Sequence, residues 1–229
     1  MHSKKQIVTA PRDKDVTGAG ASSLANGLNH LRLLQINVNK QLSHKRLELE
    51  ALVAKYEVDV VMAQEAQCTK DCQPLLSGFT AFRCACEKCH KLVTFVRNGL
   101  TARQVDAPRS CVGRTDTLIL EVYKRGVKYT CVNVYNPPKT ELSFDLKEAL
   151  YVRTVVAGDF NAKSTAWGCP TTDVSGRKVS EICDRSNLVL LQDTDSHPTF
   201  LHSAHGGGIE ARLDHHFSGL NVSSLDNSG

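Results

Sequence analysis

Residues 155–162 read Val155-Val156-Ala157-Gly158-Asp159-Phe160-Asn161-Ala162, an apolar run that meets a glycine and is followed by a carboxylate and a carboxamide. The run predicts a buried strand, and alternation along it would bring Asp159 and Asn161 to one face at the strand's end. Gly158 has no side chain, so another backbone or a ligand can come close to it. Such a strand suits the positioning of a water and a phosphate, but an Asx turn after a core strand would produce the same octamer. The rest of the chain has to decide between the two.

Composition places the chain among proteins with reduced thiols inside the cell. Its 229 residues, 41% of them hydrophobic, allow one sizeable core or two small domains. No apolar run approaches the length of a membrane span and no signal peptide opens the chain, so no membrane partner is expected. Nine cysteines without a signal peptide indicate reduced intracellular thiols. The formal net charge of +4 permits a polyanionic partner without requiring one.

Apolar strands and short helices follow a leader that is poor in large apolar residues. The leader, residues 1–29, cannot bury enough surface to order itself, and we expect it to be flexible, with one domain over residues 30–229. Strands are predicted at residues 31–39, 58–63, 79–84, 92–97, 117–123, 127–135, 155–159, 188–191, 199–201 and 209–217, and helices at residues 44–56, 142–150 and 177–187. Because hairpins interrupt the alternation, the expected fold is α/β (α+β). It is a four-layer α/β sandwich of two mixed β-sheets packed face to face with helices outside.

Carboxylates and amides gather at the predicted strand ends, with no cysteine or histidine at zinc spacing among them. The set comprises Asn37, Asn39, Glu65, Tyr135, Asp159, Asn161 and Asp214. Hard oxygen ligands of this kind suit magnesium, or manganese in its place, and magnesium is typically held by one or two carboxylates with several waters. Such a site can polarise a phosphodiester and stabilise a leaving alkoxide.

Five short motifs containing these polar residues follow one another through the chain. They are Gln35-Ile36-Asn37-Val38-Asn39, Gln64-Glu65, Asn133-Val134-Tyr135, Gly158-Asp159-Phe160-Asn161 and Arg212-Leu213-Asp214. Together they resemble the endonuclease/exonuclease/phosphatase superfamily, which includes apurinic/apyrimidinic endonucleases and pancreatic-type DNases. Four further pieces lie beyond Asn161 at suitable spacing, namely Trp167-Gly168, Gly176-Arg177, Asn187-Leu188 and Pro198-Thr199-Phe200. With them, the second half resembles the apurinic/apyrimidinic-like endonuclease domain that opens non-LTR (LINE-type) retrotransposon polyproteins, and the resemblance covers residues 31–217.

The resemblance implies a magnesium-dependent endonuclease that nicks target DNA in the nucleus. The 3′-hydroxyl it leaves would prime reverse transcription by the reverse-transcriptase region of the same polyprotein. By the resemblance, Glu65 would hold the magnesium with support from Asn37. Asp159 would orient or deprotonate the attacking water, and Asn161 would help to place that water and the phosphate.

Two further roles follow from the same resemblance. Tyr135 would donate a hydrogen bond to a phosphate oxygen, and Asp214 would orient a histidine that stabilises the charge building on the scissile phosphate.

Two features depart from the family's pattern. Asn39 stands where the superfamily often has aspartate, which weakens or removes a contact to metal or water there. A closing Ser-Asp-His motif is expected about one strand after Asp214, but the sequence reaches Gly229 without it, and His215 and His216 belong to the strand of Asp214. From the sequence we therefore expect a C-terminally incomplete domain with little or no nicking activity. The alternatives are a non-catalytic nucleic-acid-binding remnant, or a phosphodiesterase of the same superfamily acting on abasic sites, RNA or a phosphoinositide.

Further residues are expected at a DNA surface, including Asn39. Lys40 and Lys163 flank the strand ends and would contact phosphates, unless they only form a solvated surface. Trp167, the sole tryptophan, would line the DNA groove or fill the core beneath its own loop. The tip at His205 resembles a hairpin that related nucleases place near the minor groove, and a flexible glycine turn is the alternative.

A cysteine-rich segment precedes the strand predicted at residues 92–97. Cys84, Cys86 and Cys89, with Cys68 and Cys72 upstream, could coordinate zinc, but their spacing is irregular. Reduced surface thiols are the alternative.

Overall fold

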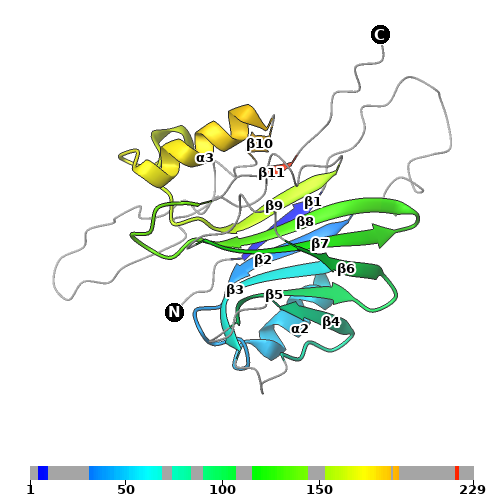
Figure 1. Ribbon diagram of the computed structural model, residues 1–229. Helices are drawn as coiled ribbons and strands as arrows, with labels where there is room; N and C mark the ends of the chain where they lie inside the picture. The colour runs from blue at the N-terminus through cyan, green and yellow to red at the C-terminus, as the bar shows by residue number, and fades with distance from the viewer. Residues whose placement is uncertain are drawn as a thin grey trace, which may run out of the picture.

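Two β-sheets lie against each other, with a helix on the outer side of each (Figure 1). The computed structural model describes residues 5–9, 31–68, 74–83, 90–106, 115–143, 153–186, 188–190 and 220–221. None of the helices in this described part of the chain combines the length and the apolar character needed to cross a membrane.

The first sheet contains five strands in the order β1-β2-β3-β5-β4. They are β1 (Lys5–Thr9), β2 (Arg32–Asn37), β3 (Val60–Cys68), β5 (His90–Arg97) and β4 (Phe79–Arg83). β2 and β3 run parallel, whereas the other neighbours are antiparallel. Because β2 and β3 are parallel and Asn37 pairs with Gln64, the end of β2 lies level with the part of β3 that carries Glu65, and β3 itself continues to Cys68.

The second sheet contains six strands in the order β10-β11-β9-β8-β7-β6. They are β10 (Val189–Leu190), β11 (Leu220–Asn221), β9 (Thr154–Asp159), β8 (Val127–Tyr135), β7 (Asp116–Lys124) and β6 (Thr101–Val105). β8 and β9 are the parallel pair, and Tyr135 lies opposite Asp159 in their register. This sheet therefore brings two polar strand ends to one edge.

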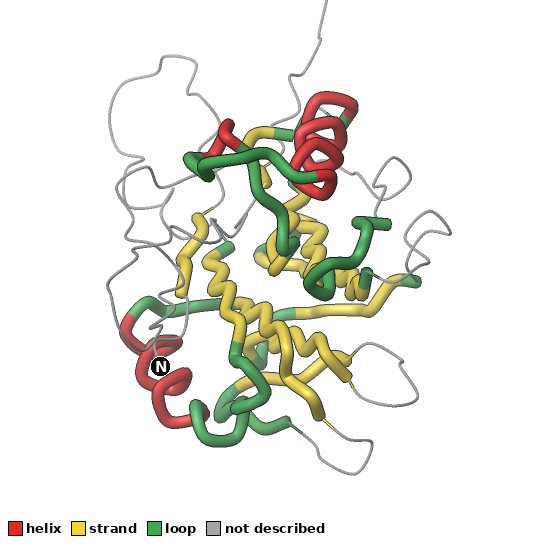
Figure 2. Tube along the Cα trace, turned by 90° about the vertical axis from the view of Figure 1, so that its left-hand side faces the viewer, coloured by secondary structure: helices red, strands yellow, loops and turns green. Residues whose placement is uncertain are grey.

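Three apolar clusters separate four layers. The cluster between the first sheet and α2 (Arg46–Lys55) includes Ile36, Val61 and Phe95 with Leu49 and Val53. The cluster between the sheets includes Leu33, Val60 and Met62 with Leu120, Val122 and Val155. The cluster between the second sheet and α3 (Val174–Arg185) includes Val132, Val134 and Val156 with Val179 and Ile182. Figure 2 shows the two helices on opposite sides of the paired sheets, so the expected four-layer sandwich is confirmed.

The helices begin at other residues than the sequence indicated. α2 begins at Arg46 rather than at residue 44, and its N-cap Lys45 makes no side-chain capping hydrogen bond. α3 begins at Val174 because Asp173 caps it, accepting a hydrogen bond from the backbone N–H of Gly176. Strand β6 was not predicted, and it pairs with β7 as an outer strand. Most of the helix expected at residues 142–150 and the strands expected at residues 199–201 and 209–217 lie outside the described residues.

Part of the expected leader is a strand. Residues Lys5–Thr9 form β1, which pairs antiparallel with β2. Composition argued for flexibility here, but pairing with the open edge of β2 supplies backbone hydrogen bonds that a short segment lacks by itself. For these five residues the expectation was wrong, and the other residues of the leader lie outside the described part.

Gly158 is required by the close approach of β8. A Cβ atom built on Gly158 would lie 2.0 Å from the carbonyl oxygen of Val134. The backbone of a paired strand cannot yield without breaking its own hydrogen bonds, so a larger residue would push β9 away from β8.

We predict that Gly158→Ala lowers the free energy of unfolding by about 3 kcal/mol, because the methyl group overlaps a backbone oxygen. Urea denaturation would measure the change. Gly78→Ala is the control: its φ of 78° disfavours alanine but its Cβ would meet nothing within 4 Å, so its cost is about 1–2 kcal/mol. Equal costs for the two variants would show that overlap with β8 is not the constraint.

Candidate active site at the carboxylate edge

Asn37 joins the polar strand ends of the two sheets. Its Nδ2 donates a hydrogen bond of 2.9 Å to Oε1 of Glu65 in β3 and one of 2.7 Å to Oδ2 of Asp159 in β9. Its Oδ1 accepts the backbone N–H of Asn39 at 2.9 Å, which fixes the orientation of the amide. We call Asn37, Glu65, Tyr135 and Asp159 together the carboxylate edge; Glu65 lies within β3, and the other three are the last residues of their strands. The geometry therefore holds two carboxylates from different sheets around one amide group.

Asp159 and Asn161 form a turn directly after β9. The backbone N–H of Asn161 donates to Oδ1 of Asp159 at 3.1 Å, and the side-chain amide of Asn161 donates to the backbone carbonyl of Asn136 at 2.8 Å. Asn161 has a φ of 44°, a conformation that asparagine tolerates better than most residues. The side chain of Asp159 thus uses one oxygen for the turn and the other for Asn37.

Tyr135 lies within the negative field of this edge. Burial raises the pKa of its hydroxyl, and the carboxylates of Glu65, Asp159 and Asp116 raise it further, as does its hydrogen bond with Glu65. The phenol therefore keeps its proton at physiological pH and can act as a hydrogen-bond donor.

A buried chain of amides lies beneath the carboxylate edge. Nε2 of Gln35 donates to Oε1 of Gln64 at 2.5 Å, and Nε2 of Gln64 donates to Oδ1 of Asn133 in the opposite sheet at 2.7 Å. Nδ2 of Asn133 then lies 3.1 Å from Oγ1 of Thr94, with further bonds to the carbonyl groups of Ala63 and Val93. Gln64 and Asn133 have no exposed surface, so this chain fixes β3 against β8 one residue before Glu65.

Several residues beside the site have strained backbones. Asn39, Lys40, Glu65 and Gln67 have φ values between 45° and 62°. The N–H of Lys40 bonds to the carbonyl of Glu65 at 2.8 Å, so the two loops hold each other in this conformation. Positive φ in non-glycine residues is costly and is often found at functional sites.

The loop after Asn161 is anchored to α3. Oδ1 of Asp173 accepts the N–H groups of both Gly176, at 2.7 Å, and Lys163, at 3.1 Å. A Cβ on Gly176 would lie 1.8 Å from the carbonyl oxygen of Lys163, so glycine is required where the helix meets the loop. The glycine of the Gly176-Arg177 motif is thus explained by packing against the loop that follows Asp159.

Comparison with known proteins relates the chain to a family and to a fold. Residues 129–227 match a protein family described as endonuclease-reverse transcriptase. The structure is similar to the endonuclease domain of TRAS1, a telomere-specific non-LTR retrotransposon, with a TM-score of 0.65, 22% identity and coverage of 84% of this chain and 85% of that one. The chain has the endonuclease/exonuclease/phosphatase fold.

A curated relative of this chain is a transposon protein. Over 174 residues, 72% of this chain, the sequence is 26% identical to a probable RNA-directed DNA polymerase from transposon X-element of Drosophila melanogaster. The chain spans 18% of that relative's length. The resemblance to the endonuclease domains of non-LTR retrotransposons, indicated by the motifs, is confirmed.

The endonuclease/exonuclease/phosphatase fold brings together most of the residues chosen from the sequence. Asn37, Glu65, Tyr135, Asp159 and Asn161 lie at the carboxylate edge. Asn39 and Lys40 are exposed beside it and Lys163 is partly exposed on the anchored loop. Asp214 and His205 lie outside the described residues, as do Cys72, Cys84, Cys86 and Cys89.

Trp167 does not line a groove. It lies in the short 3-10 helix η2 (Thr165–Trp167), is 2% exposed and belongs to the apolar cluster between the second sheet and α3. The expectation that it binds DNA was wrong, because its ring is buried beneath the loop; the alternative, a core residue, is what the structure shows.

Sequence reasoning missed two groups of residues at the site. Asn136 is fully buried, and its amide bonds to Oγ1 of Thr115 and to the carbonyl groups of Thr140 and Phe160. Asn136 stands directly after Tyr135, and a polar residue next to a predicted site residue was a usable signal. Lys91 and Asp116 form an ion pair beside Tyr135, and no local pattern relates these two positions.

The donor set of the carboxylate edge suits magnesium. Glu65 is partly exposed and Asp159 is held nearby by the same amide, which gives the one or two carboxylates that this ion commonly takes while keeping waters. Among the described residues, no group of three or more His, Cys, Asp or Glu side chains gathers as a metal cluster.

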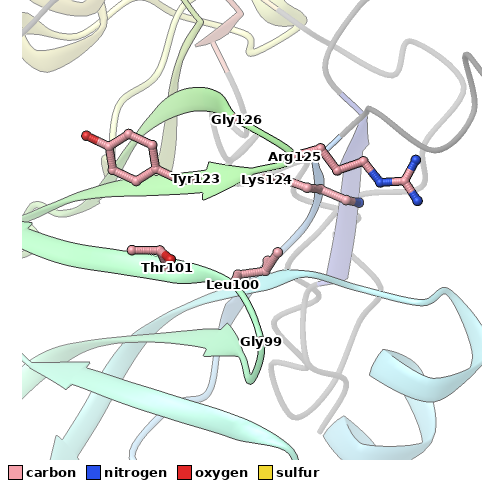
Figure 3. Close-up of a pocket in the computed structure, with 7 residues that line it drawn as sticks. All are labelled: Gly99, Leu100, Thr101, Tyr123, Lys124, Arg125 and Gly126. Carbon is pink, nitrogen blue, oxygen red and sulfur yellow. The ribbon is translucent and has the colours of Figure 1, made fainter.

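A hollow of about 590 Å³ opens at the other end of the sheets (Figure 3). It lies between the turn after β5 and the turn between β7 and β8, and is lined by Gly99, Leu100, Thr101, Tyr123, Lys124, Arg125 and Gly126. β8 runs from this hollow to Tyr135, so the hollow and the carboxylate edge are a strand's length apart. It contains none of the predicted site residues.

We predict that Asn37→Ala lowers the free energy of unfolding by about 2–4 kcal/mol in EDTA, because two carboxylate oxygens lose a donor. Denaturation with urea would measure it. Asn98→Ala provides the control, since exposed Asn98 accepts one side-chain hydrogen bond from Thr80, and should cost less than about 1 kcal/mol. If Asn37→Ala were as mild as the control, the amide would not be holding the edge together.

Proposed function

We propose that this chain is a magnesium-dependent DNA endonuclease domain that nicks target DNA by hydrolysis of a phosphodiester. The observation that supports this most directly is the amide of Asn37, which holds Glu65 and Asp159 from opposite sheets at one point. Members of the superfamily with this fold include nucleases and phosphatases, and a hydrolase role follows from the same architecture.

We assign the two carboxylates of the carboxylate edge different catalytic roles. Glu65, partly exposed and bonded to Asn37, would hold the magnesium ion. Magnesium bound there would polarise the phosphodiester and stabilise the leaving alkoxide. Asp159 would orient the attacking water and accept its proton, because its carboxylate is held at a fixed orientation by Asn37 and by the turn.

The neutral residues would position the phosphate. Asn161, fixed by its bond to the carbonyl of Asn136, would place the water and a phosphate oxygen. Tyr135 keeps its proton and would donate to another phosphate oxygen after releasing Glu65. Exposed Lys40 and partly exposed Lys163 would contact neighbouring phosphates.

The biological role that we propose is target-primed reverse transcription. The nick would leave a 3′-hydroxyl, and a reverse-transcriptase region of a parent polyprotein would extend it. The similarity to a transposon RNA-directed DNA polymerase supports this partner. Because chromosomal DNA is the target, we place the activity in the nucleus.

The proposed function predicts slow conversion of supercoiled plasmid to the open circle in magnesium and none in EDTA. Glu65→Gln and Asp159→Asn should each lower the rate by about 10²-fold or more, because a metal ligand or the water-orienting base is lost. Gel electrophoresis measures the nicks, and direct extension by a DNA polymerase tests for the 3′-hydroxyl.

Glu181→Gln is the control, since Glu181 lies on the exposed face of α3 and pairs with Arg185. Abasic duplex and RNA substrates test the other activities of the superfamily. Plasmid that stays intact after prolonged incubation with concentrated protein, while DNA is still bound, would favour the non-catalytic binding protein instead.

A further inference from the structure

A lysine ammonium lies beside Tyr135 of the carboxylate edge. Lys91 follows the first residue of β5, next to Leu92, which pairs with Gln64 of β3. Lys91 therefore lies beside the strand end that carries Glu65. Its Nζ is 3.3 Å from Oδ2 of Asp116 and 5.6 Å from the centroid of the Tyr135 ring.

Lys91 connects the two sheets at this edge. It belongs to the first sheet, whereas Asp116 and Tyr135 belong to the second and lie directly opposite each other in the β7–β8 register. The ion pair and the cation–π contact thus fix the ammonium next to the phenol that we propose as a phosphate donor.

The ammonium still has capacity for a ligand. It carries three N–H donors, and one carboxylate oxygen and a ring face do not use all of them. The side chain of Lys91 is 35% exposed, so a ligand at the edge can reach it from solvent.

Lys91 supplies a positive charge beside carboxylates that would otherwise repel an anionic ligand. Glu65, Asp159 and Asp116 all act on Tyr135, so a polyanion that approaches this edge meets three carboxylates. A fixed cation at the same place offsets part of that repulsion.

We propose that Lys91 is a substrate-binding residue, whose ammonium binds a backbone phosphate of the DNA next to the scissile one while Asp116 holds the side chain in place. This inference rests on the proposed function, because it assigns a further contact to the same substrate. The alternative is a purely structural pair that clamps β5 to β7.

Fluorescence anisotropy with a labelled duplex oligonucleotide, over a range of KCl concentrations and with calcium in place of magnesium, measures binding without cleavage. Lys91→Met should weaken binding about tenfold and make the slope of log affinity against log salt shallower by about one, because one phosphate contact is lost. Lys91→Arg should keep the charge and most of the affinity.

Lys128→Met is a matched control. Lys128 is 38% exposed and pairs with Glu121 at 3.2 Å, which resembles the Lys91 pair, but it lies near the start of β8, away from the carboxylate edge. This variant should bind DNA like the wild-type chain.

Asp116→Asn distinguishes phosphate binding by Lys91 from a purely structural Lys91–Asp116 ion pair. If Lys91 binds phosphate, this variant keeps the ammonium, removes a competing negative charge and binds DNA at least as tightly as the wild type. If the pair is only a clamp, Asp116→Asn and Lys91→Met should weaken binding alike, and the proposal fails. Circular dichroism of each variant checks that it is folded.

The two proposals fail in different ways. A wild-type chain that neither binds nor nicks DNA would overturn the proposed function itself. A wild-type chain that binds DNA, with Lys91→Met and Lys128→Met indistinguishable from each other, would overturn the role of Lys91 alone.

Discussion

The two hydrogen bonds from the amide of Asn37 set the geometry of the whole carboxylate edge. An amide nitrogen has two hydrogens, and here one is donated to Glu65 of the first sheet and the other to Asp159 of the second. The shared donor offsets part of the repulsion between the two carboxylates, and a hydroxyl group, which has one hydrogen, could serve only one of them. The packing of one sheet on the other is therefore also the arrangement of the site.

The apolar core alone could not align the sheets this closely. Contacts such as those of Met62 and Val155 are non-directional and would tolerate a shift of one sheet across the other. The buried bonds from Gln35 through Gln64 to Asn133 are directional, and a shift would leave fully buried amides without partners. We infer that this chain of amides sets the alignment on which the Asn37 contacts depend.

The sequence predicted those parts of the site that lie next to apolar strands. Asn37, Glu65 and Asp159 each follow a run of buried apolar residues in the sequence, and parallel pairing within each sheet brings the ends of such runs to one edge. The contact between Lys91 and Asp116 could not be predicted, because it depends on how β5 and β7 of different sheets face each other. The role of Trp167 was ambiguous for a related reason. Residues of α3 pack in the same apolar cluster as Trp167, and this packing, which the local sequence does not show, makes Trp167 a core residue. The start of α3 could have been predicted, since Asp173 precedes Gly176 at the spacing of a helix cap.

The octamer at residues 155–162 allowed either a catalytic pair or an ordinary Asx turn, and the structure shows that the two are compatible. Oδ1 of Asp159 accepts the N–H of Asn161 and makes the turn, while Oδ2 bonds to Asn37 at the edge. The turn requires a residue that accepts a φ of 44°, and asparagine meets that need while also supplying an amide. The backbone and the proposed chemistry therefore select the same residue type at position 161. Substituting Asn161 by alanine would disturb both together, whereas Asp159→Asn keeps an oxygen for the turn and removes the negative charge, which makes it the more informative variant of the two.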